Sequence, residues 1–520
     1  MKANGNEVSK KHQKFLDKFS ILLLALCACC GLASSQKWTQ LTTQFPVGVV
    51  LQLTDGTIMV QENKTTNWWR LRPNNVGVYS AGMWSAMPSN PAGYAPLYFA
   101  SATLPDGRVI IEGGEFNNLG TGDTTLGAIY SPFTNKWTPV NPPAGWSRIG
   151  DAASVVLPNG KFMLANCCDI PAQAALLNAS TLTWQVLDNV TGFVGKNDSN
   201  NEEGWNLLPN GDVLAIDTYV GVPGEGHGGS ESEIYNPATG VWKDAGSTIV
   251  QLWDSKLGCG STGSTHEIGP AVLRPNGTVF ATGSNTCPGS AGHTAIYDVA
   301  TATWTAGPDV PGVNDVADGP ASILPDGNVL VDTNPGYGKN PSTLYEFPLD
   351  DSGWINIPQP AGLNPSNTEG GRMLVLPSGN VLLSHVDSFN LWIYQPKGTY
   401  RNAWRPTICP GCFPAVCHVG HTYKVSGTQF NGLSQGAAFG DDAQSATNFP
   451  LVQIRNNATG HRFFARTHSF STMAVATGSK VTSTEFDILP TSAGTEFGDS
   501  TMVVIANGIP SEPVGIIVED

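Results

Sequence analysis

The sequence predicts an all-β protein in which a seven-bladed β-propeller is followed by a β-sandwich. A short turn phrase recurs seven times, and its glycines lie 51, 53, 51, 66, 50 and 52 residues apart. A short apolar strand follows each turn, and a tryptophan recurs at a similar distance beyond six of them. A period near 50 residues indicates a radial repeat, and kelch-type propeller blades have about this length. We therefore expect one large propeller domain rather than several small ones.

The repeated phrase reads Leu-Pro-Asp-Gly or Leu-Pro-Asn-Gly in most copies, which is the chemistry of a hairpin turn. Proline presets φ, Asp or Asn hydrogen-bonds its own backbone, and glycine adopts a positive φ. The seven turn glycines are Gly56, Gly107, Gly160, Gly211, Gly277, Gly327 and Gly379.

The strands after these turns are short apolar runs, such as residues 109–112 and 213–216, which suit burial on both faces. We interpret the recurring tryptophans as packing residues between blades, not as ligands. They are Trp84, Trp137, Trp184, Trp242, Trp304 and Trp354. No such tryptophan follows the seventh turn, and Trp38, ahead of the first turn, fills the gap. The N-terminal strand should therefore complete the last blade and remove the exposed edges of an open ring.

The repeat ends near residue 400, and the chain then changes character. Residues 401–520 hold alternating strands, such as 422–425 and 502–505, separated by Asn-Gly turns. This pattern predicts an immunoglobulin-like β-sandwich. The predicted domains are a signal peptide over 1–35, the propeller over 36–400 and the sandwich over 401–520.

The N-terminus has the features of a secretory signal. Five lysines precede an apolar run over 19–33, and Ser34-Ser35 provides a small-residue cleavage site. The run is short for a membrane span, which needs about 20 apolar residues, so a retained anchor is the alternative. Sequons for N-glycosylation fit a secreted, extracellular glycoprotein. They are Asn63, Asn178, Asn189, Asn197, Asn276 and Asn457.

Seven cysteines follow the predicted signal peptide, and an oxidising compartment favours disulfides. A Cys259–Cys287 disulfide would tie one blade. Cys409 and Cys412 lie close to a third cysteine, Cys417, and to two histidines, His418 and His421. That group suits either a disulfide or a zinc cluster, and the extracellular context favours the disulfide. The odd number of cysteines leaves one thiol unpaired.

Charge argues against nucleic-acid and anionic membrane partners. Lys and Arg total 27 against 42 Asp and Glu, and the formal net charge is −15. No basic stripe is visible along the chain.

This organisation resembles the galactose oxidase and glyoxal oxidase superfamily, whose members join a kelch-type propeller to a C-terminal early-set domain. Two local matches carry the resemblance beyond the repeat. Gly113-Gly114 follows the strand 108–112, and Thr467-His468-Ser469-Phe470-Ser471 lies in the C-terminal domain. The resemblance implies copper radical oxidases, whose Cu(II) is held by two tyrosines and two histidines, with one tyrosine thioether-linked to a cysteine. Alcohols, aldehydes and carbohydrates are then the implied partners, and hydrogen peroxide the implied product.

Only part of that ligand set matches this chain. His468 corresponds to the histidine of the C-terminal domain, and Tyr98 to the cross-linked tyrosine. The cysteine belongs in residues 45–48, which read Phe-Pro-Val-Gly, and the family's Tyr-His pair is Glu369-Gly370 here. The resemblance therefore implies a degenerate copper site.

A second register for matching the family's ligand positions to this chain, shifted by one blade, stays open. It places Phe99-Ala100 at the Phe-Cys position and Asp151 at the tyrosine, and Tyr98 is then no ligand. Neither register supplies a cysteine.

Acidic residues recur just ahead of the turn strands, where the blades should converge on the axis. They are Asp151, Glu202-Glu203, His266-Glu267, Asp318 and Glu369. Clustered carboxylates raise one another's pKa or recruit a cation. Oxygen ligands suit Ca²⁺, whereas adding His266 and His468 admits a transition metal such as copper. The alternative is that these acids are solvated loop residues or caps of backbone amides.

Three functions follow as hypotheses. The first is a galactose-oxidase-like extracellular protein that binds glycans or cell wall and has lost its copper chemistry. The second is a copper-dependent oxidase of alcohols or aldehydes with a divergent ligand set that includes Tyr98, His468 and His266. The third is a structural coat or adhesion protein.

Overall fold

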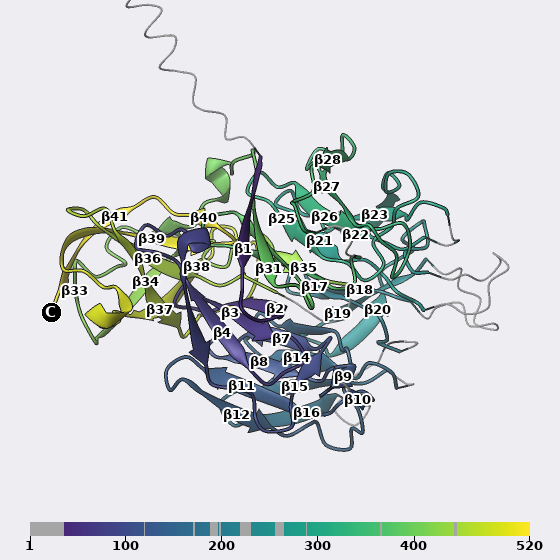
Figure 1. Cartoon of the computed structure of the whole chain (residues 1–520), viewed down its shortest axis with the longest axis horizontal. Coiled ribbons are helices and arrows are strands. Elements are labelled where there is room, and N and C mark those ends of the chain that lie inside the picture. The colour runs from purple at the N-terminus through teal and green to yellow at the C-terminus, as the bar shows by residue number, and fades with distance from the viewer. Residues whose placement is uncertain are drawn as a thin grey trace, which may run out of the picture.

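The computed structural model describes residues 36–118, 120–169, 172–187, 196, 199–218, 230–254, 265–285, 287, 289–363, 367–440 and 445–520. It confirms the predicted all-β fold. Seven sheets form the propeller blades, and the C-terminal strands gather on one side of them (Figure 1). Each blade has four strands, and a fifth strand extends the sixth blade.

The first strands of the seven blades pack against one another around the axis. They are short and buried along their whole length. In chain order they are β2 (Val47–Gln52), β7 (Ala100–Thr103), β13 (Ser154–Val156), β17 (Trp205–Leu207), β21 (Ala271–Leu273), β25 (Ala321–Ile323) and β29 (Gly371–Val375).

The remaining blade strands follow outward in sequence order. The second strands are β3 (Ile58–Glu62), β8 (Val109–Glu112), β14 (Phe162–Ala165), β18 (Val213–Ile216), β22 (Thr278–Thr282), β26 (Val329–Thr333) and β30 (Val381–His385). The third are β4 (Trp68–Arg72), β11 (Gly127–Ser131), β15 (Ala174–Asn178), β19 (Ser232–Asn236), β23 (Thr294–Asp298), β27 (Thr343–Phe347) and β31 (Asn390–Gln395). The outer strands are β5 (Met83–Met87), β12 (Lys136–Val140), β16 (Thr183–Leu187), β20 (Val241–Asp244), β24 (Thr303–Ala306), β28 (Ile355–Ile357) and β1 (Lys37–Thr42).

The repeated phrase forms the turn between the first and second strand of each blade, as predicted. In blade 2, Gly107 has φ 83° and its N–H donates to the Leu104 carbonyl at 2.9 Å. Asp106 Oδ1 accepts the N–H of Arg108 at 3.1 Å. The seven turns therefore lie at one end of the propeller, and the residues ahead of the first strands lie at the other.

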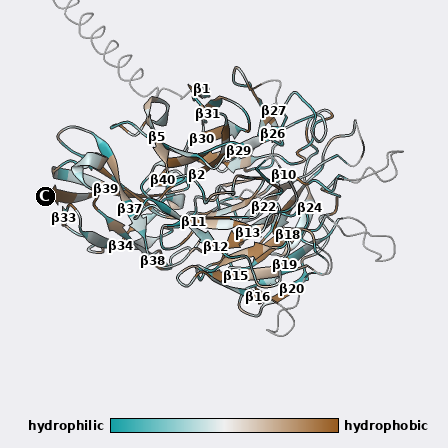
Figure 2. Ribbon diagram, turned by 60° about the horizontal axis from the view of Figure 1, so that its bottom comes forward, coloured by the Kyte–Doolittle hydropathy of each residue, from teal (hydrophilic) through white to brown (hydrophobic). Residues whose placement is uncertain are grey.

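The N-terminal strand closes the ring, as the missing seventh tryptophan predicted. β1 pairs antiparallel with β31 over its whole length and forms the outer edge of blade 7. Trp38 Nε1 donates to the Pro358 carbonyl of blade 6 at 2.9 Å. Trp137 and Trp184 make the equivalent bond to the preceding blade, at 3.0 and 2.8 Å. These indoles are packing residues between blades, and Figure 2 shows apolar strands within the blades.

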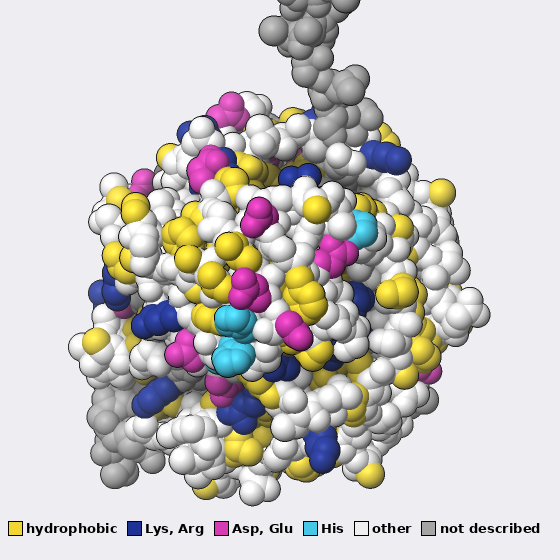
Figure 3. Space-filling model, turned by 90° about the vertical axis from the view of Figure 1, so that its left-hand side faces the viewer, with side chains coloured by type: hydrophobic (Ala, Val, Ile, Leu, Met, Phe, Trp, Pro, Cys, Tyr) yellow, Lys and Arg dark blue, Asp and Glu magenta, His cyan; other side chains and the backbone are white. Residues whose placement is uncertain are grey.

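The C-terminal residues form the predicted β-domain as one continuous sheet that curls around its own apolar core. Its strands are β32 (Thr407–Ile408), β33 (Val416–His418), β34 (Thr422–Thr428), β36 (Leu451–Asn456), β37 (Arg462–His468), β38 (Val481–Asp487), β39 (Gly498–Ala506), β40 (Ile509–Pro510) and β41 (Val514–Glu519). Small pieces complete the structure: β6 (Pro96–Leu97), β9 (Phe116–Asn117), β10 (Gly120–Thr121), and the 3₁₀ turns η1 (Tyr79–Ala81), η2 (Asn402–Trp404) and η3 (Thr491–Ala493). Figure 3 shows charged and apolar side chains interspersed on the side where this domain lies.

The C-terminal domain docks on the turn end of the propeller. Its backbone N–H groups donate to turn carbonyls of three successive blades. Thr467 bonds Thr54 at 3.1 Å, Phe470 bonds Pro105 at 2.9 Å and Met473 bonds Pro158 at 3.2 Å.

One segment of this domain enters the propeller itself. β35 (Ala437–Ala438) pairs with β25 and extends blade 6. The neighbouring Gln435 accepts the N–H of Leu207 from blade 4 at 2.7 Å, and Ser445 donates to the Val50 carbonyl of blade 1 at 3.2 Å. The segment therefore occupies the axis and contacts blades on opposite sides of the ring.

The cysteines agree in part with the predicted pairing. Cys409 and Cys412 form a disulfide, so their sulfurs are not held by zinc, and Cys417 is a free, buried thiol. Cys287 is disulfide-bonded, but its predicted partner Cys259 lies outside the described residues. A disulfide that was not predicted joins the adjacent residues Cys167 and Cys168.

The sequons differ in accessibility. Asn178, Asn276 and Asn457 are exposed. Asn63 is buried, and its Nδ2 donates to Asp387 at 2.9 Å, so this amide faces the protein instead of solvent. Asn189, Asn197 and the predicted signal peptide lie outside the described residues. In the part of the chain that is described, no helix combines the length and apolarity needed to cross a bilayer.

Ring closure predicts a sharp difference between two positions of β1. Leu41 is buried in the core between blades 7 and 1, whereas Lys37 is exposed. Leu41→Ala should lower the free energy of unfolding by about 2–4 kcal/mol, and Lys37→Ala should change it by less than about 0.5 kcal/mol. Urea titration followed by tryptophan fluorescence measures both. Equal effects of the two substitutions would contradict the conclusion that β1 stabilises the closed ring through its buried side chain.

Candidate functional site

The candidate site lies at the end of the axis opposite to the turns. Four polar residues just ahead of first strands have a left-handed backbone there: Tyr98 (φ 51°), Glu202 (φ 55°), His266 (φ 63°) and Asp318 (φ 43°). Non-glycine residues rarely adopt this region, and it costs free energy. Strained backbone of this kind clusters at functional sites. Its recurrence at or near the same repeat position therefore marks this end of the propeller as the candidate site.

Three carboxylates from three successive blades meet at this end. Glu202, Glu267 and Asp318 each have an oxygen within 4.8 Å of the others. Glu267 is buried, and the other two are half-buried. We call these three residues the acidic centre.

Not every predicted acid joins the acidic centre. Glu203, next to Glu202, is buried inside the blade, where it forms an ion pair with Lys196. Lys196 also contacts Asp217 at 2.8 Å. The alternation of side chains along the strand entry explains why two adjacent glutamates have different surroundings.

Tyr98 and Glu369 meet beside the acidic centre. The Tyr98 hydroxyl donates to Glu369 Oε1 at 3.2 Å. Arg372, which is buried, lies over the Tyr98 ring at 5.3 Å and donates to the Glu369 backbone carbonyl at 2.9 Å. Tyr98 thus lies at the same end of the axis as the acidic centre, which both registers allow.

Tyr337 is a member of this site that the sequence reasoning missed. It lies in the loop after β26, between Gly336 and Gly338. Burial, followed by the negative charges of Glu267, Asp318 and Glu369, raises its pKa far above the ordinary value. The phenol therefore stays protonated and is available as a hydrogen-bond donor. An aromatic residue between two loop glycines was the available signal.

The segment of the C-terminal domain that occupies the propeller axis, around β35, reaches this site from the turn end of the propeller. Arg372 stacks on the Phe439 ring at 3.5 Å. A side chain at Gly440 would place its Cβ 3.0 Å from Asp318 Oδ1 and 2.7 Å from the Ile268 carbonyl, so only glycine fits against the acidic centre. The C-terminal domain thus contributes Phe439 and Gly440 here.

His468 does not join the acidic centre. Its Cβ lies beside Gly107, in a turn at the opposite end of β7 from Tyr98. Its Nε2 lies 3.2 Å from Asp487 Oδ1, and its ring packs edge-on against Phe133 at 5.4 Å. The pentapeptide 467–471 therefore docks the domain instead of reaching through the axis.

Asp487 is strongly stabilised as a carboxylate in this docking region. Burial alone would raise its pKa, but hydrogen bonds from His468, Thr422 and Arg466 outweigh burial and hold the pKa well below its usual range. Arg466 Nη2 lies 2.8 Å from Asp487 Oδ2. His468 is therefore a structural partner of Asp487.

His266 lies next to Glu267 but outside the acidic centre. Its ring stacks on Trp253 at 4.7 Å, and its Nδ1 lies 2.6 Å from the Thr218 carbonyl. Asp254 Oδ1 accepts the His266 backbone N–H at 2.7 Å. These contacts hold the ring against Trp253 and the Thr218 carbonyl, outside the group of three carboxylates.

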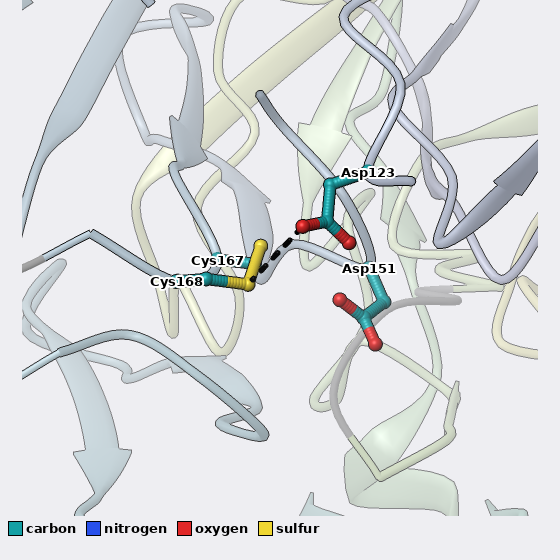
Figure 4. A group of neighbouring side chains, drawn as sticks. All are labelled: Asp123, Asp151, Cys167 and Cys168. Atoms are coloured by element: carbon teal, nitrogen blue, oxygen red, sulfur yellow. Dashed lines mark hydrogen bonds between the residues drawn. A yellow bond between two sulfur atoms is a disulfide. The ribbon is translucent and has the colours of Figure 1, made fainter. Parts of the chain in front are cut away.

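A second cluster lies in the neighbouring blades at the same end of the axis. The ligating atoms of Asp123, Asp151, Cys167 and Cys168 lie within 4.8 Å of one another. Figure 4 shows both carboxylates near the disulfide. Cys168 Sγ also lies 3.3 Å from Asn201, the residue before Glu202. The two clusters are therefore adjacent.

Among the comparisons with known proteins, only those with solved structures find a match, and that match concerns the fold. No protein-family model matches the chain, and no curated protein matches it. A novel fungal alcohol oxidase of the AA5 family, solved in complex with copper, is similar over 93% of this chain and 100% of that chain, with 14% identity and a TM-score of 0.52. The galactose-oxidase-like fold is confirmed. A streptogramin B lyase is similar over 69% of this chain and 97% of its own, with 8% identity and a TM-score of 0.47.

Among the described residues, the acidic centre does not offer the tyrosine and histidine donors of the copper-radical site that the sequence resemblance implied. The resemblance placed the family's tyrosine and histidine at Glu369 and Gly370, and a Cβ at Gly370 would lie 2.5 Å from the His385 ring. Both His385 nitrogens lie 3.0 Å from backbone carbonyls, and burial lowers its pKa. The acidic centre offers oxygen donors only, and Cu(II) sites of this kind need imidazole nitrogen.

The docking role of His468 and Asp487 predicts a pH-dependent stability effect. At pH 7, Asp487→Asn should lower the free energy of unfolding by about 1.5–3 kcal/mol, the range for hydrogen bonds to charged groups. A carboxyl with a lowered folded pKa contributes stability above its unfolded pKa, near about 4. That contribution is lost as the pH falls toward the folded pKa.

Urea titrations at pH 7 and pH 3 measure this effect. The difference between Asp487→Asn and the unsubstituted protein should shrink at pH 3. Asp499→Asn, at an exposed position of the same domain, is the matched control. A pH-independent loss in Asp487→Asn would contradict this assignment.

Proposed function

We propose that this protein is a secreted, glycan-binding relative of the galactose-oxidase-like propellers whose acidic centre binds a hard divalent cation of the Ca²⁺ class. The observation that carries the proposal is the approach of Glu202, Glu267 and Asp318 to within 4.8 Å. The predicted signal peptide and the exposed sequons support an extracellular location.

The geometry suits calcium in size and donor type. Ca²⁺ takes six to eight oxygens at about 2.3–2.6 Å. An ion between three oxygens spaced this closely needs only small side-chain movements to reach such distances. Three carboxylates leave coordination positions for water or for ligand hydroxyls. A cation also offsets the repulsion among these acids.

Carbohydrate is the ligand class that the surrounding groups favour. Sugar hydroxyls coordinate Ca²⁺ and accept hydrogen bonds from phenols. Tyr98 and Tyr337 stand beside the acidic centre, and burial, followed by the neighbouring carboxylates, raises the pKa of Tyr337, so its phenol stays a hydrogen-bond donor. Aromatic rings also pack against the C–H faces of sugars.

Removing the carboxylates tests the cation site. We expect the combined variant Glu202→Gln, Glu267→Gln, Asp318→Asn to lose the binding of one Tb³⁺ or Ca²⁺ per chain, because neutral amides cannot compensate the ion's charge. Terbium luminescence and calorimetry measure this binding. Asp350 is exposed and is not one of the three clustered carboxylates, so Asp350→Asn should retain the bound ion. Absence of binding in the unsubstituted protein would overturn the proposal.

Retention on immobilised neutral and uronic-acid polysaccharides tests the ligand class. Retention should require Ca²⁺, should be reversed by EDTA and should be weakened in the combined variant. A calcium-loaded protein that is retained by none of the polysaccharides would leave a cation site without a glycan function.

An oxidase of alcohols or aldehydes is the second candidate, because Tyr98 lies beside Glu369 near the acidic centre and the fold is similar to that of a copper-complexed alcohol oxidase. We expect the copper-loaded protein to release no peroxide above the rate of free copper across a panel of sugars, alcohols and aldehydes. Peroxide release that is lost in Tyr98→Phe would favour the oxidase. If the protein binds neither cation nor glycan and releases no peroxide, the hypothesis of a structural coat or adhesion protein would be favoured.

A further inference from the structure

The disulfide between Cys167 and Cys168 has an unusual position, because it joins adjacent residues. A disulfide stabilises a fold mainly by closing a loop in the unfolded chain, and the effect grows with loop length. This pair closes no loop of other residues. Stapling of the fold therefore does not explain why two cysteines stand here.

The surroundings of the pair are those of a metal site. Asp123 and Asp151 come from separate segments, and their carboxylates lie within 4.8 Å of both sulfurs (Figure 4). Cys168 Sγ lies 3.9 Å from Asp123 Oδ2. Cys167 is fully buried, and the other three residues are half-buried. As long as the sulfurs are bonded to each other, neither is a thiolate ligand.

We propose that reduction of the Cys167–Cys168 disulfide creates a binding site for Zn²⁺ or a similar soft divalent ion, with two thiolates and the carboxylates of Asp123 and Asp151 as ligands. Four donors of this kind suit tetrahedral zinc, which accepts Cys sulfur and Asp oxygen. The site is independent of the calcium-class acidic centre, whose donors are all oxygen.

The redox step needs an external thiol reductant. Two thiols of a small dithiol transfer two electrons and two protons to the disulfide, so the S–S bond breaks, two cysteine thiols form and the dithiol becomes its own disulfide. Metal binding then releases the two thiol protons. Disulfide and metal complex are thus mutually exclusive states of the same four residues.

Arg148 is positioned to moderate the charge of the metal-bound state. Its side chain lies 3.4 Å from Asp123 Oδ2 and 3.4 Å from Asp169 Oδ1. Two thiolates and two carboxylates exceed the charge of one divalent ion, and the neighbouring guanidinium offsets part of the excess. Arg148 is half-exposed, so its guanidinium can yield the Asp123 oxygen to an ion and remain beside the site through its contact with Asp169.

The experiment compares the oxidised and reduced states of the full chain. The protein is reduced with a dithiol, desalted without oxygen and titrated with Cd²⁺, whose thiolate complexes absorb in the ultraviolet. The background is a variant in which Cys409, Cys412, Cys287 and its predicted partner Cys259 are all replaced by serine, so that reduction frees no other disulfide-bonded thiols. We expect one Cd²⁺ per reduced chain with thiolate absorption, and none in the oxidised chain.

Two variants identify the ligands. Cys167→Ser, Cys168→Ser should lose the absorption band, and Asp123→Asn, Asp151→Asn should weaken binding by more than about tenfold, since even outer-shell losses cost that much. Asp169→Asn, which contacts Arg148 instead of the sulfurs, is the matched control.

A second measurement keeps the proposal testable if a variant fails to fold. In the reduced, unsubstituted chain, Zn²⁺ should protect Cys167 and Cys168 from alkylation, as read by peptide mass spectrometry. Equal alkylation with and without Zn²⁺, or equal Cd²⁺ binding by oxidised and reduced chains, would overturn the proposal. Neither outcome depends on Ca²⁺ or glycan binding.

Discussion

The passage of the C-terminal segment along the propeller axis is the constraint on which the rest of the structure depends. The first strands of the blades are only three to six residues long and leave polar backbone groups facing the channel. β35, Gln435 and Ser445 satisfy some of these groups in blades 6, 4 and 1. Because these contacts join opposite sides of the ring, the C-terminal domain and the propeller form one unit, and the end of the segment is fixed beneath the acidic centre.

That fixed end explains how carboxylates from separate blades are held together against their repulsion. Gly440 leaves no room for a side chain between the segment and Asp318, so the floor of the site is backbone. Arg372 lies between Phe439 and Tyr98 and binds the backbone beside Glu369, which places a positive charge at one edge. The strained backbone of Glu202 and Asp318 is maintained because each is followed by a strand locked in a blade. A rigid frame of this kind concentrates the negative charge of Glu202, Glu267 and Asp318 at one end of the axis.

The repeat made much of this predictable, because it identifies which residues lie at the same end of every blade. Tyr98, Glu267 and Asp318 were expected near one another on that basis, and the closure through Trp38 followed from a missing tryptophan. The repeat says nothing of how a non-repeated domain threads the ring, so sequence matching assigned the axial position to His468, although the segment around Gly440 reaches it. Tyr337 lies in a loop whose path depends on tertiary packing, and the pairing of Cys167 with Cys168 was not foreseen because adjacent cysteines rarely bond to each other.

The same topology restricts where function can reside. The C-terminal domain hydrogen-bonds to the turns of blades 1, 2 and 3, so that end of the propeller is engaged in docking. Both polar clusters lie at the other end, because each blade delivers its entry residue and its second-strand loop there. Asn201 contacts Cys168 and precedes Glu202, so the two clusters share a boundary. One offers only oxygen, and the other offers sulfur when it is reduced. Their donors therefore suit different ions, and the oxygen donors of the acidic centre do not change with the redox state of its neighbour.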